Sequence, residues 1–284
     1  MTTLLHLLSR YVLLAFSAAF LAACGGGDPS AVAAPPSASP AAGSASTLAS
    51  LSGTQTYSLA YGATEIGIDQ RSVTATFTTA NGLNAYYSAV NEGLLIGSMQ
   101  LSELSGSSHL QIGRWHSGQF GGVYYSLVPA STSFALSAQQ GWAYAIGKPP
   151  EKIICTGSSS YRQTAATALF QANGTIALGT INTLTASVTY NSSVSPQFAI
   201  SGEYTINSVT ANFTLNQQAQ VGNAMMYRVS GTDSAGRSIT LIGVFAGPNA
   251  DEKGFILNAS SSSNATVYRG AARLVQTSST RNCP

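Results

Sequence analysis

From residue 51 to the end of the chain, apolar and polar residues alternate, and this pattern restricts the fold more than any other feature. In 187–190 (Ser-Val-Thr-Tyr) and 210–215 (Thr-Ala-Asn-Phe-Thr-Leu), every second residue is apolar. Successive side chains of a strand point to opposite faces of a sheet, so a period of two predicts strands with one buried face. Charged residues make up only 8% of the chain, so the polar faces consist mainly of hydroxyl and amide groups. The pattern predicts an all-β protein.

The second half shows this alternation most regularly, and we expect an eight-stranded antiparallel β-barrel over residues 149–284. Evenly spaced short strands separated by turn signals are typical of sandwiches and barrels, and eight strands suit a barrel filled by its own side chains. Outward aromatic girdles are not evident, which makes a membrane-spanning barrel a poorer fit. The expected strands are 159–164, 184–190, 198–206, 209–215, 225–231, 238–246, 254–259 and 266–275.

The first half predicts a smaller β-rich region over residues 51–148. Strands are expected at 54–61, 72–78, 123–127 and 142–146, with Asn81-Gly82 as a turn. The segments 94–104 and 109–115 continue the sheet or include a short helix. Pro149 and Pro150 cannot continue a central strand, so we place the boundary between the two regions there.

The N-terminus predicts export. Arg10 precedes an apolar run over 11–23 that ends in Leu21-Ala22-Ala23-Cys24. A basic start, a short apolar stretch and a small-residue exit are typical of a signal peptide, here residues 1–23. The cysteine after Leu-Ala-Ala resembles a bacterial lipobox, and that resemblance implies that Cys24 is acylated and becomes the first mature residue.

Residues 24–50 are expected to form a flexible tether behind the lipid. The segment is rich in Gly, Ala, Pro and Ser and has almost no large apolar residue to bury. A coil of this length reaches roughly 25 to 30 Å. Gly25 stands where the lipoprotein resemblance would have an aspartate as an inner-membrane retention signal, which favours the outer membrane. Two or more acyl chains anchor stably, and the sequence leaves open whether the protein faces the periplasm or the outside.

Two cysteines remain once Cys24 is assigned to the lipid. Cys155 and Cys283 have one intramolecular connectivity in an oxidising compartment, and we expect a disulfide. It would attach the extreme C-terminus to the start of the second half, with an upper stabilisation of about 4 to 5 kcal/mol from loop entropy. The alternative is two free thiols.

The segment 243–255 (Gly-Val-Phe-Ala-Gly-Pro-Asn-Ala-Asp-Glu-Lys-Gly-Phe) resembles the late hairpin of transferrin-binding protein B-like β-barrels. Gly247-Pro248 is expected to form its tight turn, and Asn249 tolerates left-handed geometry. Residues 112–115 and 142–150 resemble the lead-in of the same group. The resemblance implies a single lobe, in which a handle-like region precedes one barrel. Its named members bind host iron carriers or other host proteins through variable loops, so transferrin binding itself is not implied.

Several functional classes are disfavoured. The mature chain has two histidines, His109 and His116, and no G-x-S-x-G or H-E-x-x-H motif, so we expect no enzyme and no metal site. No Lys/Arg cluster indicates nucleic-acid binding. The expected function is non-enzymatic binding of a protein or iron carrier at the outer membrane. The alternatives are a structural envelope lipoprotein without a soluble ligand, and a binder of haem or another small molecule.

Aromatic residues and one histidine provide the candidate ligand site. These residues are Trp115, His116, Tyr124 and Tyr125, with Phe120 nearby and Tyr86-Tyr87 as further aromatics. Tyr and His are haem-iron ligands, and aromatic rings supply a flat apolar wall. The flanking glycines 113, 118, 121 and 122 suggest an exposed, bent loop. Tyr-rich loops also suit protein recognition, and the remaining alternative is ordinary sheet aromatics with a surface histidine.

Overall fold

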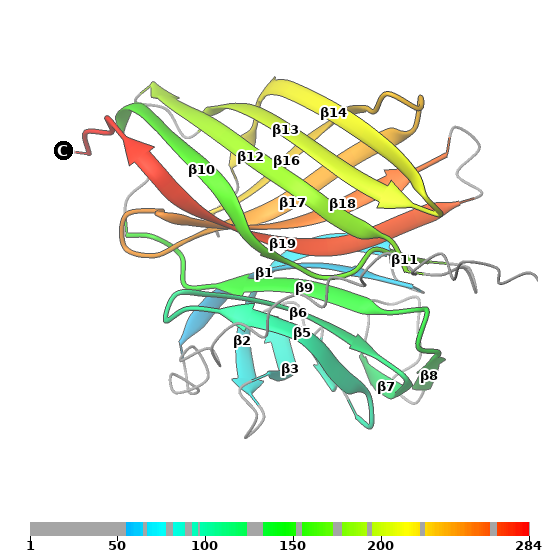
Figure 1. The fold of residues 1–284 in the computed structure, drawn as a ribbon. Coiled ribbons are helices and arrows are strands. Elements are labelled where there is room, and N and C mark those ends of the chain that lie inside the picture. Colours follow the sequence, from blue (N-terminus) through cyan, green and yellow to red (C-terminus); the bar gives the residue numbers. More distant parts are fainter. Residues whose placement is uncertain are drawn as a thin grey trace, which may run out of the picture. The chain divides into compact units, whose positions relative to one another are not determined.

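The computed structural model describes residues 55–64, 67–77, 82–88, 93–95, 97–123, 133–151, 155–172, 178–191, 195–221, 225–261 and 266–283. These residues all belong to one compact unit. Over the described ranges every regular element is a strand, as the alternation predicted, and the strands form two antiparallel sheets (Figure 1). The part of the chain described here has no helix long and apolar enough to cross a membrane.

The first sheet has nine strands in the order β5-β6-β9-β1-β2-β3-β4-β7-β8. It curls into a half-barrel that brings the two ends of this strand order together: Ser98, beside β5, donates a backbone hydrogen bond to Gln119 of β7 at 3.0 Å. The strands are β1 (Thr56–Ala63), β2 (Gly67–Phe77), β3 (Leu83–Ser88), β4 (Gly93–Leu95), β5 (Gln100–Gly106), β6 (Leu110–His116), β7 (Gly118–Val123), β8 (Ser133–Leu136) and β9 (Trp142–Gly147).

The second sheet is the nearly closed eight-stranded barrel that the sequence predicted. Its strands are β10 (Thr156–Ala166), β12 (Thr180–Asn191), β13 (Gln197–Ile206), β14 (Val209–Gln218), β16 (Met226–Thr232), β17 (Ser238–Ala246), β18 (Glu252–Ser260) and β19 (Val267–Ser279). The short β11 (Phe170–Gln171) pairs with β19, and β15 (Gln220–Val221) pairs with β16. A bridge between Phe213 and Asp233 joins β14 to the end of β16 and brings the two edges of the sheet together.

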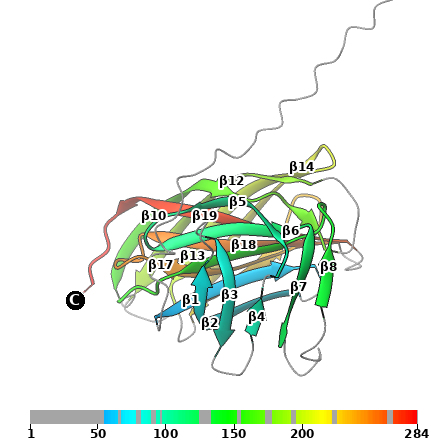
Figure 2. The same cartoon turned by 90° about the horizontal axis from the view of Figure 1, so that it is seen from below.

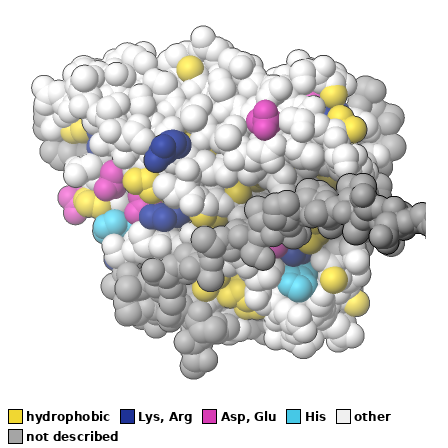
Figure 3. Space-filling view, in the orientation of Figure 1, with side chains coloured by type: hydrophobic (Ala, Val, Ile, Leu, Met, Phe, Trp, Pro, Cys, Tyr) yellow, Lys and Arg dark blue, Asp and Glu magenta, His cyan; other side chains and the backbone are white. Residues whose placement is uncertain are grey.

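The barrel interior is filled by alternate side chains of its strands. Phe255, Leu257 and Ala259 of β18 are buried in the core with the tyrosines and phenylalanines of β10, β12, β13 and β16. The opposite faces of β12, β13 and β14 carry mainly exposed Thr, Ser, Asn and Gln. Charged side chains are correspondingly sparse on the face of the molecule seen in Figure 3.

The two sheets meet through small side chains. Ala60, Ala143 and Ala145 of the first sheet share a buried cluster with Ile242, Val244, Ala246 and Ile256 of the barrel. A Cβ added at Gly254 would lie 2.7 Å from the Cβ of Ala145, so the close approach of the sheets requires glycine there. The central strands β1, β6 and β9 are therefore buried on both faces.

The hairpin at 243–255 joins β17 to β18, as its resemblance implied. The left-handed residues of its turn are Gly247 (φ 82°) and Ala250 (φ 50°), so the turn does not use the tolerance of Asn249 for this geometry. The amide of Ala250 donates to the carbonyl of Gly247 at 3.0 Å, and this bond fixes Ala250 as the residue that turns the chain.

The segment 94–104 contains no helix in its described residues but the end of β4, a turn and β5. The strand expected at 123–127 overlaps β7 at Val123, and its residues 124–127 lie outside the described residues.

Candidate functional site

Trp115 and His116, which the sequence placed in one ligand site, are consecutive residues of β6. The side chain of Trp115 is buried in the core of the first sheet with Trp142 and Tyr144. His116 is half-buried, and its Nδ1 lies 2.7 Å from the hydroxyl of Ser117. Adjacent strand residues point to opposite faces, so the indole is a core group and does not form an exposed wall beside the imidazole.

The glycines around this pair lie in strands, and the expected exposed loop is wrong for the described residues. Gly113 is in the middle of β6, and Gly118, Gly121 and Gly122 belong to β7. At Gly113 a Cβ would come within 2.7 Å of the Tyr144 hydroxyl, so this glycine leaves room for a buried tyrosine on the paired strand β9.

Tyr124 and Tyr125 lie outside the described residues, directly after the end of β7. The register pairs Val123 of β7 with Gly93 of β4. A strand rises about 3.3 Å per residue, so Val123 is roughly 17 Å along β7 from Gly118, which follows His116 closely. Of the other aromatics, Tyr86 is buried and stacks on Trp142, while Tyr87 and Phe120 belong to β3 and β7. Haem ligation by His116 with Tyr124 or Tyr125 stays a prediction.

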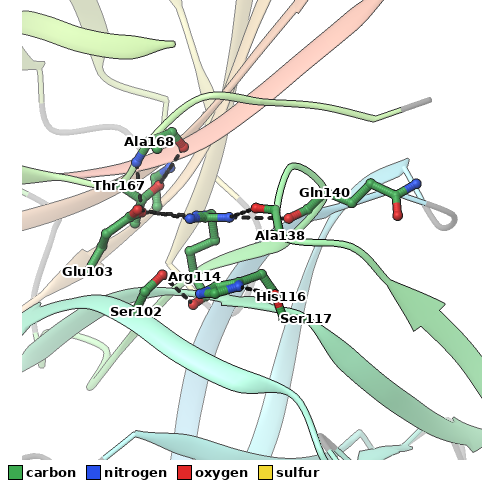
Figure 4. Close-up of polar contacts among 10 residues, drawn as sticks. Ser102, Glu103, Arg114, His116, Ser117, Ala138, Gln140, Thr167 and Ala168 are labelled. Atoms are coloured by element: carbon green, nitrogen blue, oxygen red, sulfur yellow. Dashed lines mark hydrogen bonds and ion pairs between the residues drawn. The ribbon is translucent and has the colours of Figure 1, made fainter. Parts of the chain in front are cut away.

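The structure instead brings a buried ion pair to His116 (Figure 4). Arg114 donates from Nε and Nη2 to the two carboxylate oxygens of Glu103 at 3.1 and 3.0 Å. The two side chains are only 4% and 14% exposed. Glu103 sits at a β-bulge of β5, where the register shifts between Ser102 and Ser105, and its φ is 56°. Bulges re-aim side chains, and here the bulge directs the carboxylate at the guanidinium.

The same ion pair ties three segments together. Glu103 accepts a hydrogen bond from the amide of Ala168, between β10 and β11, at 2.8 Å. Arg114 Nη1 donates to the carbonyls of Ala138 and Gln140, before β9, at 3.3 and 3.2 Å. Burial lowers the pKa of His116, Arg114 lowers it further, and Glu103 opposes them. The hydrogen-bond donors of Arg114 are used by acceptors within the protein. The ion pair is therefore best described as a structural contact that joins the half-barrel to the barrel.

A second polar cluster lies inside the barrel and was not found from the sequence. Lys253 of β18 is fully buried, and among the described residues its Nζ has no hydrogen-bond partner. Its Nζ lies 4.0 Å from the ring centroid of Tyr161 and 3.8 Å from that of Phe245. Burial lowers the pKa of Lys253 well below its ordinary value, the charge of Arg281 lowers it further, and Asp251 opposes them.

The period of two in β18 could have revealed this lysine. Lys253 is in phase with Phe255 and Leu257, which fill the barrel core, so a charged residue occupies a position where the pattern requires an apolar one. Local rules are broken most often at functional sites, which makes Lys253 a candidate functional residue.

The C-terminal segment covers the end of the barrel next to Lys253. Asn282 exchanges two backbone hydrogen bonds with Thr156, and the expected disulfide Cys155–Cys283 is present beside them. The guanidinium carbon of Arg281 lies 5.3 Å from the ring centroid of Tyr190. Within the ranges that the structure describes, no group of three or more His, Cys, Asp or Glu residues is placed to hold a metal ion.

No protein-family model matches the chain, and no curated protein matches it. Among solved structures, it is similar to transferrin-binding protein B of Haemophilus parasuis Hp5 (a Trp-176-Ala mutant), with 13% identity and a TM-score of 0.42 over 78% of this chain and 45% of that one. It is also similar to intact Ap-TbpB with N and C lobes, with 12% identity and a TM-score of 0.39 over 78% and 47%. The chain thus spans less than half the length of each.

Proposed function

We propose that this protein is a lipid-anchored, non-enzymatic binding protein of the outer membrane that engages a protein ligand at one end of the half-barrel. The observation that carries the proposal is the pairing of Gly93 with Val123. It puts the end of β3, the start of β4, the end of β7 and the start of β8 at the same end of four adjacent strands, which supports the proposal (Figure 2). The connection from β7 to β8 carries Tyr124 and Tyr125.

Binding residues are commonly found on loops that a rigid scaffold positions, and the two sheets provide such a scaffold. Besides the Glu103–Arg114 pair, Ser107 of the first sheet donates to Glu252 of the barrel at 2.5 Å, and Glu252 also accepts from Arg273 at 2.8 Å. Arg269 of β19 donates to the carbonyl of Ala63 at the end of β1. These contacts oppose sliding of one sheet against the other when a ligand binds.

The residue types of this end suit a protein ligand. Tyrosine adds large contact area at a low cost in conformational entropy, and Ser and Asn add adaptable hydrogen bonds. The segments 89–92 (Ala-Val-Asn-Glu) and 124–132 (Tyr-Tyr-Ser-Leu-Val-Pro-Ala-Ser-Thr) have this composition and carry a single charge. The resemblance of the 243–255 hairpin to transferrin-binding protein B-like barrels makes host iron carriers the first ligands to test.

Attachment to the membrane rests on the sequence. Acylation of Cys24 would hold the protein to the outer membrane, and the tether over 24–50 would separate the barrel from the bilayer. Labelling with a palmitate analogue tests this, because Cys24→Ser should abolish the label. Protease treatment of intact cells then distinguishes a surface protein, which is cleaved, from a periplasm-facing structural lipoprotein, which is protected.

The binding experiment uses the purified mature protein immobilised opposite transferrin and other host iron carriers. Tyr124→Ser combined with Tyr125→Ser should weaken binding at least about tenfold, since aromatic anchors dominate protein interfaces. Val209→Ser is the matched control, because it removes an exposed apolar side chain at the β13–β14 turn. Equal affinity of the tyrosine variant and the parent protein would overturn the proposed surface. Haemin added to the same samples tests the haem alternative through the Soret band.

A further inference from the structure

The end of the barrel closed by the C-terminal segment holds two cationic groups with unused hydrogen-bonding capacity. The Nζ of Lys253 is fully buried without a hydrogen-bond partner in the described part of the chain. The same holds for the Nη1 atom of Arg281, which comes from a different segment. The two groups lie beside the same pair of tyrosines: the Lys253 ammonium lies over the ring of Tyr161, the Arg281 guanidinium lies near the ring of Tyr190, and the two tyrosine hydroxyls are 3.3 Å apart. A buried donor without an acceptor costs free energy.

The neighbouring hydroxyl groups relieve this deficit only in part: Tyr190 shares a side-chain hydrogen bond with Arg281, but Nη1 of Arg281 and Nζ of Lys253 have no partner among the described residues. The Tyr161 hydroxyl donates to the carbonyl of Ala250 at 3.0 Å. The hydroxyls of Tyr161 and Tyr190 are 3.3 Å apart, so the Tyr190 proton is directed at the Tyr161 oxygen. The ring faces of Tyr161 and Phe245 attract the ammonium, but a ring face does not replace a hydrogen-bond acceptor.

The charges at this end do not cancel. Asp251 is the nearby anionic group, and it acts on Lys253 through its charge without a hydrogen bond to it. Glu252, the next residue, faces the other side of β18, where it pairs with Arg273 and Ser107. When Lys253 is protonated, Lys253 and Arg281 against Asp251 leave one net positive charge, which a single monovalent anion would balance, and an anion bound there would in turn favour the protonated lysine.

We propose that this end of the barrel binds one small monovalent anion, a halide or a carboxylate group, between the ammonium of Lys253 and the guanidinium of Arg281. Arg281 is half-buried, so its guanidinium connects solvent to the enclosed lysine and provides the route of entry. The site is distinct from the proposed protein-binding end, which belongs to the other sheet.

The disulfide makes this anion site dependent on the redox state. Arg281 is two residues from Cys283, and the bond to Cys155 holds its segment against β10. Reduction would leave the segment with its hydrogen bonds to Thr156 and Ser158 and with the contact of Arg281 with Tyr190. Release of Arg281 would remove one of the two cationic groups, so the reduced protein should bind the anion about tenfold more weakly, equivalent to about 1.4 kcal/mol.

Chloride is the probe for the test, and the excess chlorine NMR line width is measured at constant ionic strength with a bulky sulfonate, which is neither a halide nor a carboxylate, as the replacing anion. The oxidised protein should show a saturable excess, which Lys253→Met abolishes and Arg281→Gln reduces. Arg162→Gln is the matched control, because it removes the same charge from an exposed position of β10. Asp251→Asn should strengthen binding, since it removes a competing carboxylate.

A crystal soaked in bromide supplies the second measurement. Anomalous density between Lys253 and Arg281 is expected, with none there in Lys253→Met. Circular dichroism establishes that each variant is folded before its binding is compared. The proposal is overturned if the parent protein shows no more line broadening than Lys253→Met, or if Arg162→Gln reduces it as much as Arg281→Gln does.

Discussion

Replacing Arg114 by methionine tests whether the Glu103–Arg114 pair joins the half-barrel to the barrel. The change removes two hydrogen bonds to a carboxylate that is 14% exposed. Hydrogen bonds to charged groups contribute about 1.5 to 3 kcal/mol each, and an uncompensated buried charge costs about 3 to 5 kcal/mol. The expected loss in the free energy of unfolding is about 3 to 5 kcal/mol, because Glu103 keeps only the amide of Ala168 as a donor.

Glu103→Gln gives the second arm of a double-mutant cycle. Glutamine keeps an acceptor for the Ala168 amide, and Arg114 keeps the carbonyls of Ala138 and Gln140 as acceptors. The free energy of unfolding should therefore fall by only about 2 kcal/mol, less than in Arg114→Met. The double variant removes both charges and should be less damaged than the sum of the single changes, by about 2 kcal/mol or more. Urea denaturation followed by fluorescence measures all four proteins.

Arg71→Met is the matched control for this cycle. Arg71 pairs with Asp69 at 2.6 Å, but the two side chains are 23% and 29% exposed. Water screens such a pair, so the expected loss is below about 1 kcal/mol. The reasoning is refuted if Arg114→Met lowers the free energy of unfolding no more than this control does. It is also refuted if the loss in the double variant equals the sum of the losses in Arg114→Met and Glu103→Gln within about 0.5 kcal/mol.

Three further predictions concern the barrel. Cys283→Ala should lower the free energy of unfolding by up to about 5 kcal/mol, because the disulfide to Cys155 closes a loop with a sequence separation of 128 residues. Calorimetry with and without reductant checks this, and an unchanged unfolding midpoint in the variant would contradict it. Ser208→Gly should stabilise the protein by about 0.5 to 1 kcal/mol, since Ser208 has a φ of 64° in a two-residue hairpin turn, whereas Ser201→Gly in mid-strand should destabilise it. Burial alone would raise the pKa of Asp233, but hydrogen bonds from Tyr204 and Arg237 hold it below its ordinary value. A carboxyl whose pKa is lower in the folded than in the unfolded state stabilises the fold at pH values above its unfolded pKa, and it loses this contribution as the pH falls below about 4. The difference in the free energy of unfolding between the parent protein and Asp233→Asn should therefore shrink at low pH, and a pH-independent difference would disprove the assignment.

The expected barrel strands overlap all eight observed ones. Alternation accounts for β12, β13 and β14, whose buried and exposed residues alternate, whereas β17 and β18 are buried at nearly every residue and were delimited by the turn signals between them. The first sheet was harder to predict. β7 contains Gly118, Gly121 and Gly122, and glycine obscures a pattern that depends on side chains. The strands β1 and β9 were predicted at 54–61 and 142–146, whereas β6 was left open between strand and helix, because it is buried on both faces and carries no clean alternation.

The sequence by itself therefore determined the strand period and, in β18, the phase that puts Lys253 with Phe255 and Leu257. Only the tertiary structure decided what each face meets. The curl of the first sheet buries Trp115 and separates His116 from the end of β7, and a bulge turns Glu103 toward Arg114. The pairing of 280–282 with β10 brings Arg281 to the end of the barrel that contains Lys253. These contacts join residues far apart in the chain, and the local pattern of a strand carries no information about its partners across the barrel.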